Sequence, residues 1–241
     1  MDNVRVFPNS DALAEALALR WKEEAEWAVK ENRLYSVVLS GGATASKVYQ
    51  KLAAPDFAEG IPWKSVHLFW ADERCVPPES EESNFRIAYR TFLNSVPIPG
   101  KNIHRIRGET DPATESARYD KEVHGHLALR QTGNHFFDWA LMGLGTDGHT
   151  ASLFSGQEKL LKTSNLCGVA RHPETGQRRI TLTPSAIQRS ACITYHVVGR
   201  QKAEMVSVLV SGSLQSKNYP AAHIRGEWYL DEAAASSLKT S

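Results

Sequence analysis

The chain has 241 residues, and 28 Lys and Arg against 27 Asp and Glu leave a formal charge of +1. This balance excludes the overall basic field typical of nucleic-acid-binding proteins, so any anion must be held by a few local groups. The hydrophobic fraction of 41% excludes a disordered chain, and a domain of this length buries about 70–75% of the surface that its unfolded chain exposes.

The cysteines indicate a reducing compartment. Cys75, Cys167 and Cys192 are odd in number, far apart and without a CxxC pair, a pattern typical of free thiols. The first residues lack the apolar core of a signal peptide, and no stretch reaches about 18 consecutive apolar residues. We therefore expect a soluble cytoplasmic protein, a monomer or small homo-oligomer, with neither a membrane nor nucleic acid as partner.

The first third of the chain predicts strands and helices in alternation. Apolar residues at three- and four-residue spacings predict an amphipathic helix from Ser10 to about Asn32. The apolar run 35–39 predicts a buried strand, and a glycine turn leads from it into a helix over 44–52. A second buried strand is predicted over 66–70.

The rest of the chain continues this pattern. Residues 72–78 are predicted as a loop, and Ser83 as the cap of a helix that reaches about Leu93. Asp111 and Pro112 open a helix predicted to reach Arg130. Further strands are predicted over 103–106, 137–142, 168–172, 179–183, 193–198 and 227–230, and further helices over 184–189, 201–210 and after Asp231.

Strands that alternate with helices predict right-handed crossovers and a mainly parallel sheet. We therefore expect an α/β fold: a single-domain, Rossmann-like, doubly wound sheet over residues 1–241, with helices on both faces. Ligands of such sheets bind beyond the carboxyl ends of the strands. The polar, glycine-bearing segments after Leu39, Trp70 and Met142 all fall at that edge, so we expect one shared site.

Two glycine-rich segments could hold phosphate groups. Gly143–Gly148 fits the G-x-G-x-x-G pattern of dinucleotide sites, but residues 164–169 lack the acidic residue expected about twenty positions later. Gly156 also leaves little room for a long following helix. Ser40-Gly41-Gly42-Ala43-Thr44 is no Walker A loop, because no glycine precedes Lys47. Its backbone could approach an anion, or it could be an ordinary tight turn.

His149 is the strongest candidate for acid–base chemistry. It follows a glycine-rich strand end, and histidine has an unperturbed pKa of about 6.5. Asp147, two residues earlier, could orient the ring and stabilise its cation. His124 and His126 stand two apart on a predicted helix, so we expect both to be solvated. Without an H-E-x-x-H segment or a cysteine cluster, we expect no metal site.

Four charged residues complete the candidate site. Asp72 and Arg74 follow a predicted strand, Arg179 begins one, and Lys202 lies in the first turn of a helix. Cations near strand ends suit a phosphate, arginine through its bidentate fork and lysine as a point charge. Taken individually, each of them is more often a surface ion-pair partner.

Taken together, these motifs resemble those of the 6-phosphogluconolactonases. The segments that carry the resemblance, in chain order, are Ser40-Gly-Gly-Ala-Thr44, Trp70-Ala-Asp-Glu-Arg-Cys-Val-Pro77, Gly143-Leu-Gly-Thr-Asp-Gly-His-Thr-Ala-Ser-Leu-Phe154, Arg179-Ile-Thr-Leu-Thr183, Gly199-Arg-Gln-Lys-Ala203, Pro220-Ala-Ala-His223 and Trp228-Tyr-Leu-Asp231. The similarity spans nearly the whole chain. Ser155 departs from the family pattern, where proline is expected.

The resemblance implies hydrolysis of 6-phospho-D-glucono-1,5-lactone in the oxidative branch of the pentose phosphate pathway, without metal or cofactor. His149 would be the general base and Asp147 its positioning partner. Arg179 and Lys202 would hold the 6-phosphate. The other residues implied around the substrate are Ser40, Gly41, Gly42, Thr44, Asp72, Arg74 and Gly145. The oxyanion donors, and the relative importance of Asp72 and Asp147, stay open.

Two rival functions are less consistent with the sequence. Glucosamine-6-phosphate deaminases share the glycine motifs but place a glutamate five residues after the histidine, where this chain has Phe154. A non-catalytic sugar-phosphate sensor would normally carry a helix-turn-helix module before this domain. The helix predicted over 11–32 is too little for that module.

Overall fold

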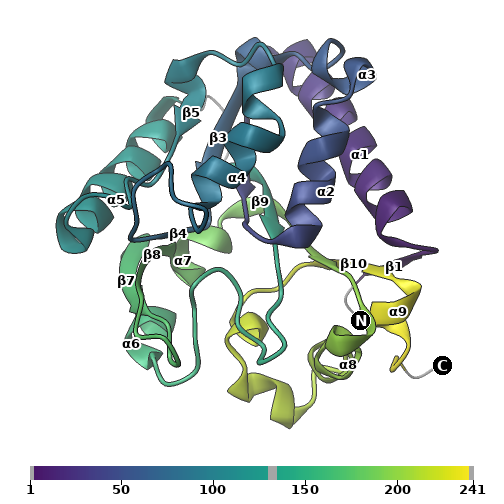
Figure 1. Cartoon of the computed structure of the whole chain (residues 1–241), viewed down its shortest axis with the longest axis vertical. Coiled ribbons are helices and arrows are strands. Elements are labelled where there is room, and N and C mark those ends of the chain that lie inside the picture. The colour runs from purple at the N-terminus through teal and green to yellow at the C-terminus, as the bar shows by residue number, and fades with distance from the viewer. Residues whose placement is uncertain (1–2, 130–134, 239–241) are drawn as a thin grey trace.

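The computed structural model describes residues 3–129 and 135–238, and its larger sheet is parallel throughout (Figure 1). The strand order is β1-β10-β9-β6-β2-β3-β5. These strands are β1 (Val4–Phe7), β2 (Tyr35–Leu39), β3 (Val66–Trp70), β5 (Ile103–His104), β6 (Phe137–Met142), β9 (Ser190–Val197) and β10 (Glu227–Asp231). The predicted α/β class with a mainly parallel sheet is confirmed.

A second, antiparallel sheet has the order β4-β8-β7. Its strands are β4 (Asp72–Arg74), β7 (Cys167–Arg171) and β8 (Arg178–Leu182). The prediction of a loop over 72–78 is therefore wrong for its first three residues. The turn from β7 to β8 is closed by His172 N–H donating to the Gln177 carbonyl at 2.9 Å. A connection this short allows only an antiparallel pair.

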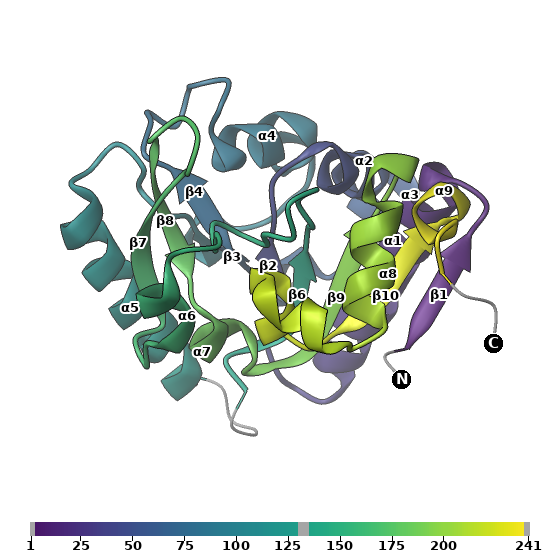
Figure 2. The same ribbon diagram turned by 90° about the horizontal axis from the view of Figure 1, so that it is seen from below.

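The helices pack against both faces of the parallel sheet. They are α1 (Ser10–Lys30), α2 (Ala43–Leu52), α3 (Pro55–Ala58), α4 (Asn84–Thr91), α5 (Pro112–Leu129), α6 (Glu158–Lys162), α7 (Pro184–Ile187), α8 (Ala203–Val210) and α9 (Glu232–Ala235), with short 3-10 turns at Trp63–Ser65, Leu93–Ser95, Gly100–Asn102, Arg200–Lys202, Leu214–Asn218 and Pro220–His223. Figure 2 shows α2 and α4 on one side of the row of strands and α5 and α7 on the other. No helix in the described ranges is both long and apolar enough to cross a membrane.

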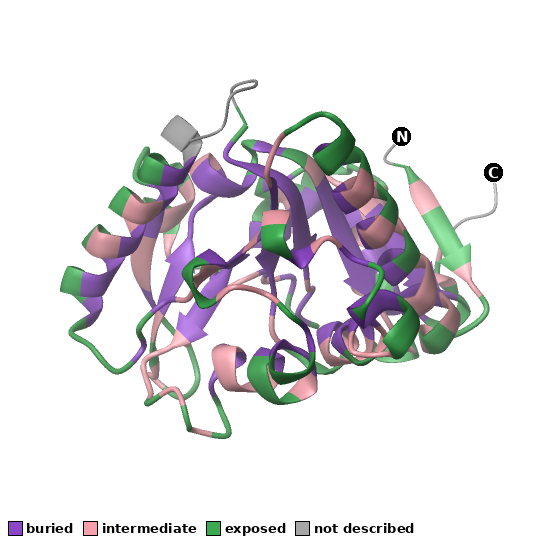
Figure 3. Cartoon of the chain, turned by 90° about the horizontal axis from the view of Figure 1, so that it is seen from above, coloured by how far each residue is buried: buried purple, intermediate pink, exposed green. Residues whose placement is uncertain are grey.

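Two local differences from the sequence predictions have physical reasons. Strand β1 was not expected, because it is a four-residue edge strand whose Arg5 and Val6 are exposed (Figure 3). His124 is exposed as expected, but the expectation for His126 is wrong, since only 3% of it is exposed. His126 follows Tyr119 and Val123 on the buried face of α5. Arg130, the predicted end of this helix, lies outside the described residues.

The direction of the chain across the sheet changes between β2 and β6. From β2 the chain proceeds outward to β3 and β5, and then returns to β6 on the other side of β2 before continuing to β9 and β10. Neighbouring strands at such a switch point send their following segments to opposite faces, which opens a crevice at their carboxyl ends. The two glycine-rich segments follow β2 and β6.

Trp21 of α1 is the centre of an aromatic cluster that joins this helix to the sheet. Its ring lies 6.4 Å from the rings of Tyr35 and Trp63 and 6.2 Å from that of Trp139, between centroids. Trp21 is fully buried. Because four large side chains share this volume, none can be shortened without leaving a cavity.

We predict that Trp21→Ala lowers the free energy of unfolding by about 3–5 kcal/mol, the cost of a large buried cavity. Trp27→Ala is the matched control, because Trp27 lies on the same helix with 56% exposure, and its ring lies 4.5 Å from the Arg33 guanidinium. Its substitution should cost less than about 1 kcal/mol. Urea unfolding of both variants measures this difference, and equal effects would contradict the packing argument.

Candidate functional site

The loop after β6 is closed by its own backbone. Gly145 N–H donates to the His149 carbonyl at 2.8 Å, and Gly148 N–H donates to the Gly145 carbonyl at 3.1 Å. Gly148 has a φ of +80°, a conformation that side chains disfavour. The Thr150 hydroxyl donates to the Gly143 carbonyl at 2.7 Å. The loop thus forms a compact turn that fixes the start of the following segment.

His149 and Asp147 face each other across this turn. The His149 Nδ1 lies 2.6 Å from the Asp147 Oδ1, and the His149 backbone N–H donates to the same oxygen at 3.3 Å. A Cβ at Gly145 would lie 2.1 Å from the His149 Nδ1 and 2.4 Å from the Asp147 Oδ1. The glycine therefore provides the space in which the two side chains meet.

The carboxyl group of Asp147 is held in its charged form. Partial burial favours the neutral form, but the neighbouring His149 ring and the hydrogen bonds from His149 together lower the pKa of Asp147. With its carboxylate on Nδ1, the ring presents Nε2 for chemistry. The His149 side chain is 31% exposed, so water can reach it.

The turn after β2 lines a cavity of about 340 Å³. Gly42 has a φ of +96° and is the N-cap of α2, which has no side-chain cap. Gly41 passes directly under Asn84, whose Oδ1 would lie 2.0 Å from a Cβ at that position. The Tyr49 hydroxyl donates to the Ser40 carbonyl at 2.6 Å, which anchors the start of the turn.

Lys202 reaches the same cavity from the turn before α8. Its ammonium group donates to the Leu144 carbonyl at 2.7 Å. Burial lowers the pKa of Lys202, and the nearby Asp147 carboxylate offsets part of this effect. The cavity is lined by Gly41, Gly42, Ala43, Thr44, Gly143, Leu144, His196, Val197, Val198, Gln201 and Lys202.

Asp72 holds three segments of the site together. Its carboxylate accepts hydrogen bonds from the Ser152 hydroxyl at 2.6 Å and from the Asn84 amide at 3.2 Å, and its carbonyl accepts from the same amide at 2.9 Å. Asp72, Asn84 and Ser152 are all buried. The carboxylate on β4 therefore links the histidine loop to the start of α4, where Asn84 lies against Gly41.

Arg74 and Arg179 are directly opposite each other on β4 and β8. Burial and the positive charge of Arg74 both lower the pKa of Arg179. The Arg179 guanidinium lies 5.9 Å from the centre of the Phe154 ring, which in turn lies 4.9 Å from the His149 ring. This face of the small sheet thus carries two close positive charges beside the histidine loop.

The candidate residues form two adjoining groups. The first comprises the Gly41-Gly42 turn, Thr44 and Lys202 around the cavity. The second is the arginine pair, which does not line that cavity and is connected to His149 through Phe154. His149 and Asp147 lie between the groups, in contact with Gly145.

Sequence reasoning did not assign roles to Asn84, Ser152, Phe154 or His196. The His196 Nε2 lies 3.3 Å from the Ser40 hydroxyl, and burial lowers its pKa to about 4. Ser152 and Phe154 belong to the motif over residues 143–154, and His196 belongs to a predicted strand that ends at the site. No sequence motif indicated a role for Asn84, because that role depends on a tertiary contact with Asp72.

The segment after the glycine loop differs from a dinucleotide site. A Rossmann phosphate loop leads directly into a helix whose N-terminus faces the pyrophosphate. Here residues 150 and 153 form an isolated bridge, and the next helix is the five-residue α6.

Comparison with known proteins agrees with these motifs. Residues 8–230 match the family described as glucosamine-6-phosphate isomerases/6-phosphogluconolactonase. A 6-phosphogluconolactonase of Haemophilus influenzae is 40% identical over 212 residues, covering 86% of this chain and 89% of the relative. One from Aggregatibacter actinomycetemcomitans is 36% identical, covering 98% of this chain and 100% of the relative.

A solved structure described as devB protein has the same fold. It superimposes with a TM-score of 0.90 at 37% identity, covering 99% of this chain and 100% of that one. The match in sequence and the match in architecture both extend over nearly the full length of the chain. This chain therefore belongs to the glucosamine-6-phosphate isomerase/6-phosphogluconolactonase family.

Proposed function

We propose that the protein hydrolyses 6-phospho-D-glucono-1,5-lactone to 6-phospho-D-gluconate, with His149 as general base. The observation that carries the proposal is the 2.6 Å contact between His149 and Asp147 at the carboxyl edge of the sheet. Relatives named 6-phosphogluconolactonase support the substrate. Phe154, at the position of the deaminase glutamate, argues against isomerase chemistry.

In the proposed mechanism, the His149 Nδ1–H donates a hydrogen bond to the Asp147 carboxylate, which leaves the Nε2 lone pair to accept a proton from water. The resulting hydroxide attacks the lactone carbonyl and forms a tetrahedral oxyanion. When the intermediate collapses, the bond to the ring oxygen breaks and the His149 cation returns the proton to that oxygen. Asp147 stabilises the cation between these two steps. These steps use protein groups alone.

The turn after β2 is our candidate for stabilising the oxyanion. The first N–H groups of a helix have no partner within the helix, and the N-cap of α2 is Gly42, which provides no side-chain cap. These groups border the cavity that also contains Lys202. Donors that are already in place cost no reorganisation when negative charge develops.

Arg179 and Lys202 are our candidates for holding the 6-phosphate, with Arg74 beside them. Like charges opposite each other on paired strands destabilise a sheet. Arg74 and Arg179 occupy such a position. A bound phosphate dianion would offset the repulsion between their guanidinium groups. Lys202 supplies a partly buried cation from the other group of residues.

We predict that His149→Gln lowers kcat/KM for the lactone about 10²–10⁴-fold, the range for loss of a general base. The lactone is generated in situ from glucose 6-phosphate, and its spontaneous hydrolysis is subtracted. His124→Gln is the control, because His124 is exposed on α5 and contacts Asp120. Near-full activity of His149→Gln would exclude this base, and release of ammonia from glucosamine 6-phosphate would contradict the proposed substrate.

We predict that Asp147→Asn lowers kcat/KM for the lactone, because a neutral amide cannot stabilise the His149 cation that forms during the reaction. The pKa of Asp147 lies below its ordinary value, so the carboxylate is charged at neutral pH, where the two proteins are compared. Steady-state kinetics at pH 7 measure the loss, and near-full activity of Asp147→Asn would show that Asp147 does not act through the ring.

We predict that Arg179→Ala raises KM for the lactone about 10-fold or more while kcat changes less, because it removes binding common to the ground and transition states. Arg178→Ala is the matched control, since Arg178 is the exposed neighbour on the same strand. Steady-state kinetics separate the two parameters. A fall in kcat without a change in KM would place Arg179 in the chemical step instead.

A further inference from the structure

Three histidines converge at the edge of the parallel sheet, outside the proposed active site. His67 comes from β3, His104 from β5 and His126 from α5. Each offers a ring nitrogen, and these nitrogens all lie within 4.8 Å of one another. The residues come from three separate segments of the chain, so their convergence is a property of the tertiary fold.

The three rings form one compact cluster. The His67 Nδ1 lies 2.9 Å from the His104 Nε2, and the planes of these two rings are inclined by only 15°. The His126 ring centre lies 4.9 Å from that of His67 and 5.6 Å from that of His104. Phe69 lies against His104, with ring centres 4.3 Å apart, and provides an apolar wall.

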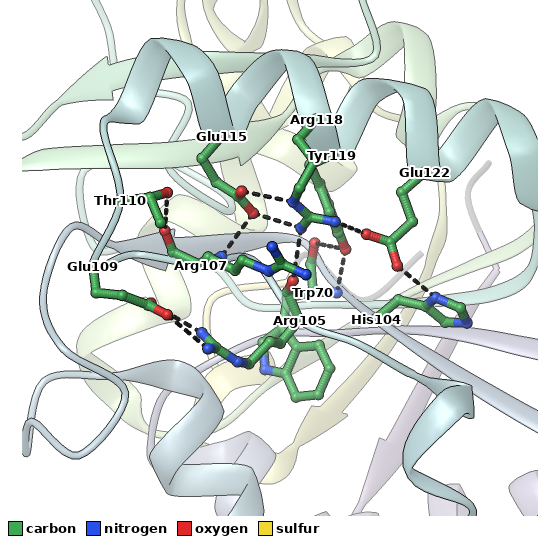
Figure 4. Close-up of polar contacts among 10 residues, drawn as sticks. All are labelled: Trp70, His104, Arg105, Arg107, Glu109, Thr110, Glu115, Arg118, Tyr119 and Glu122. Atoms are coloured by element: carbon green, nitrogen blue, oxygen red, sulfur yellow. Dashed lines mark hydrogen bonds and ion pairs between the residues drawn. The ribbon is translucent and has the colours of Figure 1, made fainter.

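Glu122 determines which nitrogen His104 presents to the cluster. Its carboxylate lies 2.7 Å from the His104 Nδ1, so that nitrogen carries the proton and Nε2 carries the lone pair (Figure 4). Arg118 contacts both Glu122 and Glu115 and holds the carboxylate in place. A carboxylate on the far nitrogen is the usual second partner of a metal-binding histidine.

The helix that carries His126 and Glu122 is fixed to the strand that carries His67. The Tyr119 hydroxyl of α5 accepts from the Trp70 N–H at 2.8 Å and donates to the Trp70 carbonyl at 3.1 Å (Figure 4). Both residues are buried. The relative positions of the histidines are thus set by main-chain anchoring as well as by their own contacts.

We propose that His67, His104 and His126 bind one divalent transition-metal ion of the Zn²⁺ class, with water as the fourth ligand. Three imidazoles are a ligand set that Zn²⁺ accepts, at about 2.0–2.1 Å from each nitrogen. Nitrogens on a tetrahedral ion lie about 3.3 Å apart. The His67 and His104 nitrogens, now 2.9 Å apart, would therefore have to separate by a few tenths of an ångström. The His126 ring would have to move toward the other two.

The cluster is not sealed from solvent. His67 and His104 are only partly buried, whereas His126 is buried. The His104 side chain keeps 15% exposure, which leaves a solvent route to the cluster. The ion would join β3, β5 and α5, and this role is independent of the proposed lactone hydrolysis.

The experiment uses the full chain, stripped with a chelator and titrated with Zn²⁺ or Co²⁺. We expect one ion per chain by equilibrium dialysis and a Tm rise of about 5–10 °C at about 100-fold excess over Kd. We also expect the intense visible absorption of tetrahedral Co²⁺. His104→Gln and His126→Gln should each abolish the Co²⁺ spectrum, and Glu122→Gln should weaken Zn²⁺ binding about 10–100-fold.

Two matched variants make the test specific. His124→Gln removes an exposed histidine from the same helix, two residues from His126, and should leave binding unchanged. His149→Gln should also retain the ion, which separates this cluster from the histidine of the proposed active site. The proposal is overturned if wild-type protein binds no ion, if binding survives His104→Gln and His126→Gln, or if His149→Gln abolishes it.

Discussion

The parallel register between β2 and β6 is the constraint on which the candidate site depends. Val37 pairs with Trp139 and Val38 with Ala140. If this register is extended by three residues beyond Val38 and Ala140, Gly41 lies opposite Gly143. Two segments that are about a hundred residues apart in sequence therefore begin side by side at one edge of the sheet. Because the chain changes direction between these strands, the segments that follow them go to opposite faces of the sheet and leave a crevice at their carboxyl ends.

A buried polar network fixes the positions of the segments at this edge of the sheet. Asp72 is almost fully buried, and its hydrogen bonds to Ser152 and Asn84 satisfy a charge that would otherwise be costly. Its neighbour Glu73 accepts from the N–H groups of Asn84 and Phe85 at 2.8 Å each and so fixes the start of α4. Two adjacent acidic residues on one short strand thus position the histidine loop and a helix.

Much of this organisation could be predicted from the sequence, because the local signals agree with the tertiary fold. Buried apolar runs predicted β2, β3 and β6, and Ser83 caps α4 through its bond from the Arg86 N–H at 3.1 Å, as its position suggested. The pairing of His149 with Asp147 followed from their spacing. The single-domain organisation and the roles of the site residues stay predictions.

What could not be predicted depends on long-range pairing. Nothing local to Asp72 shows that it begins an antiparallel strand, since its partner β8 follows a hundred residues later. The burial of His126 likewise depends on β3 and β5, which lie against that face of α5. Strand order is a further example: alternating elements indicate a parallel sheet, but they do not say where the chain reverses direction.

The near-neutral net charge conceals an uneven distribution of charged side chains in the fold. Arg74 and Arg179 face each other on paired strands and repel, although the chain has almost equal numbers of acids and bases. Elsewhere the same residue types neutralise each other, as in the Arg118 contacts with Glu115 and Glu122. The repulsion between Arg74 and Arg179 lowers the stability of the free protein. An anion that binds there recovers this cost, and selectivity for a phosphorylated substrate can thus arise without an overall positive field.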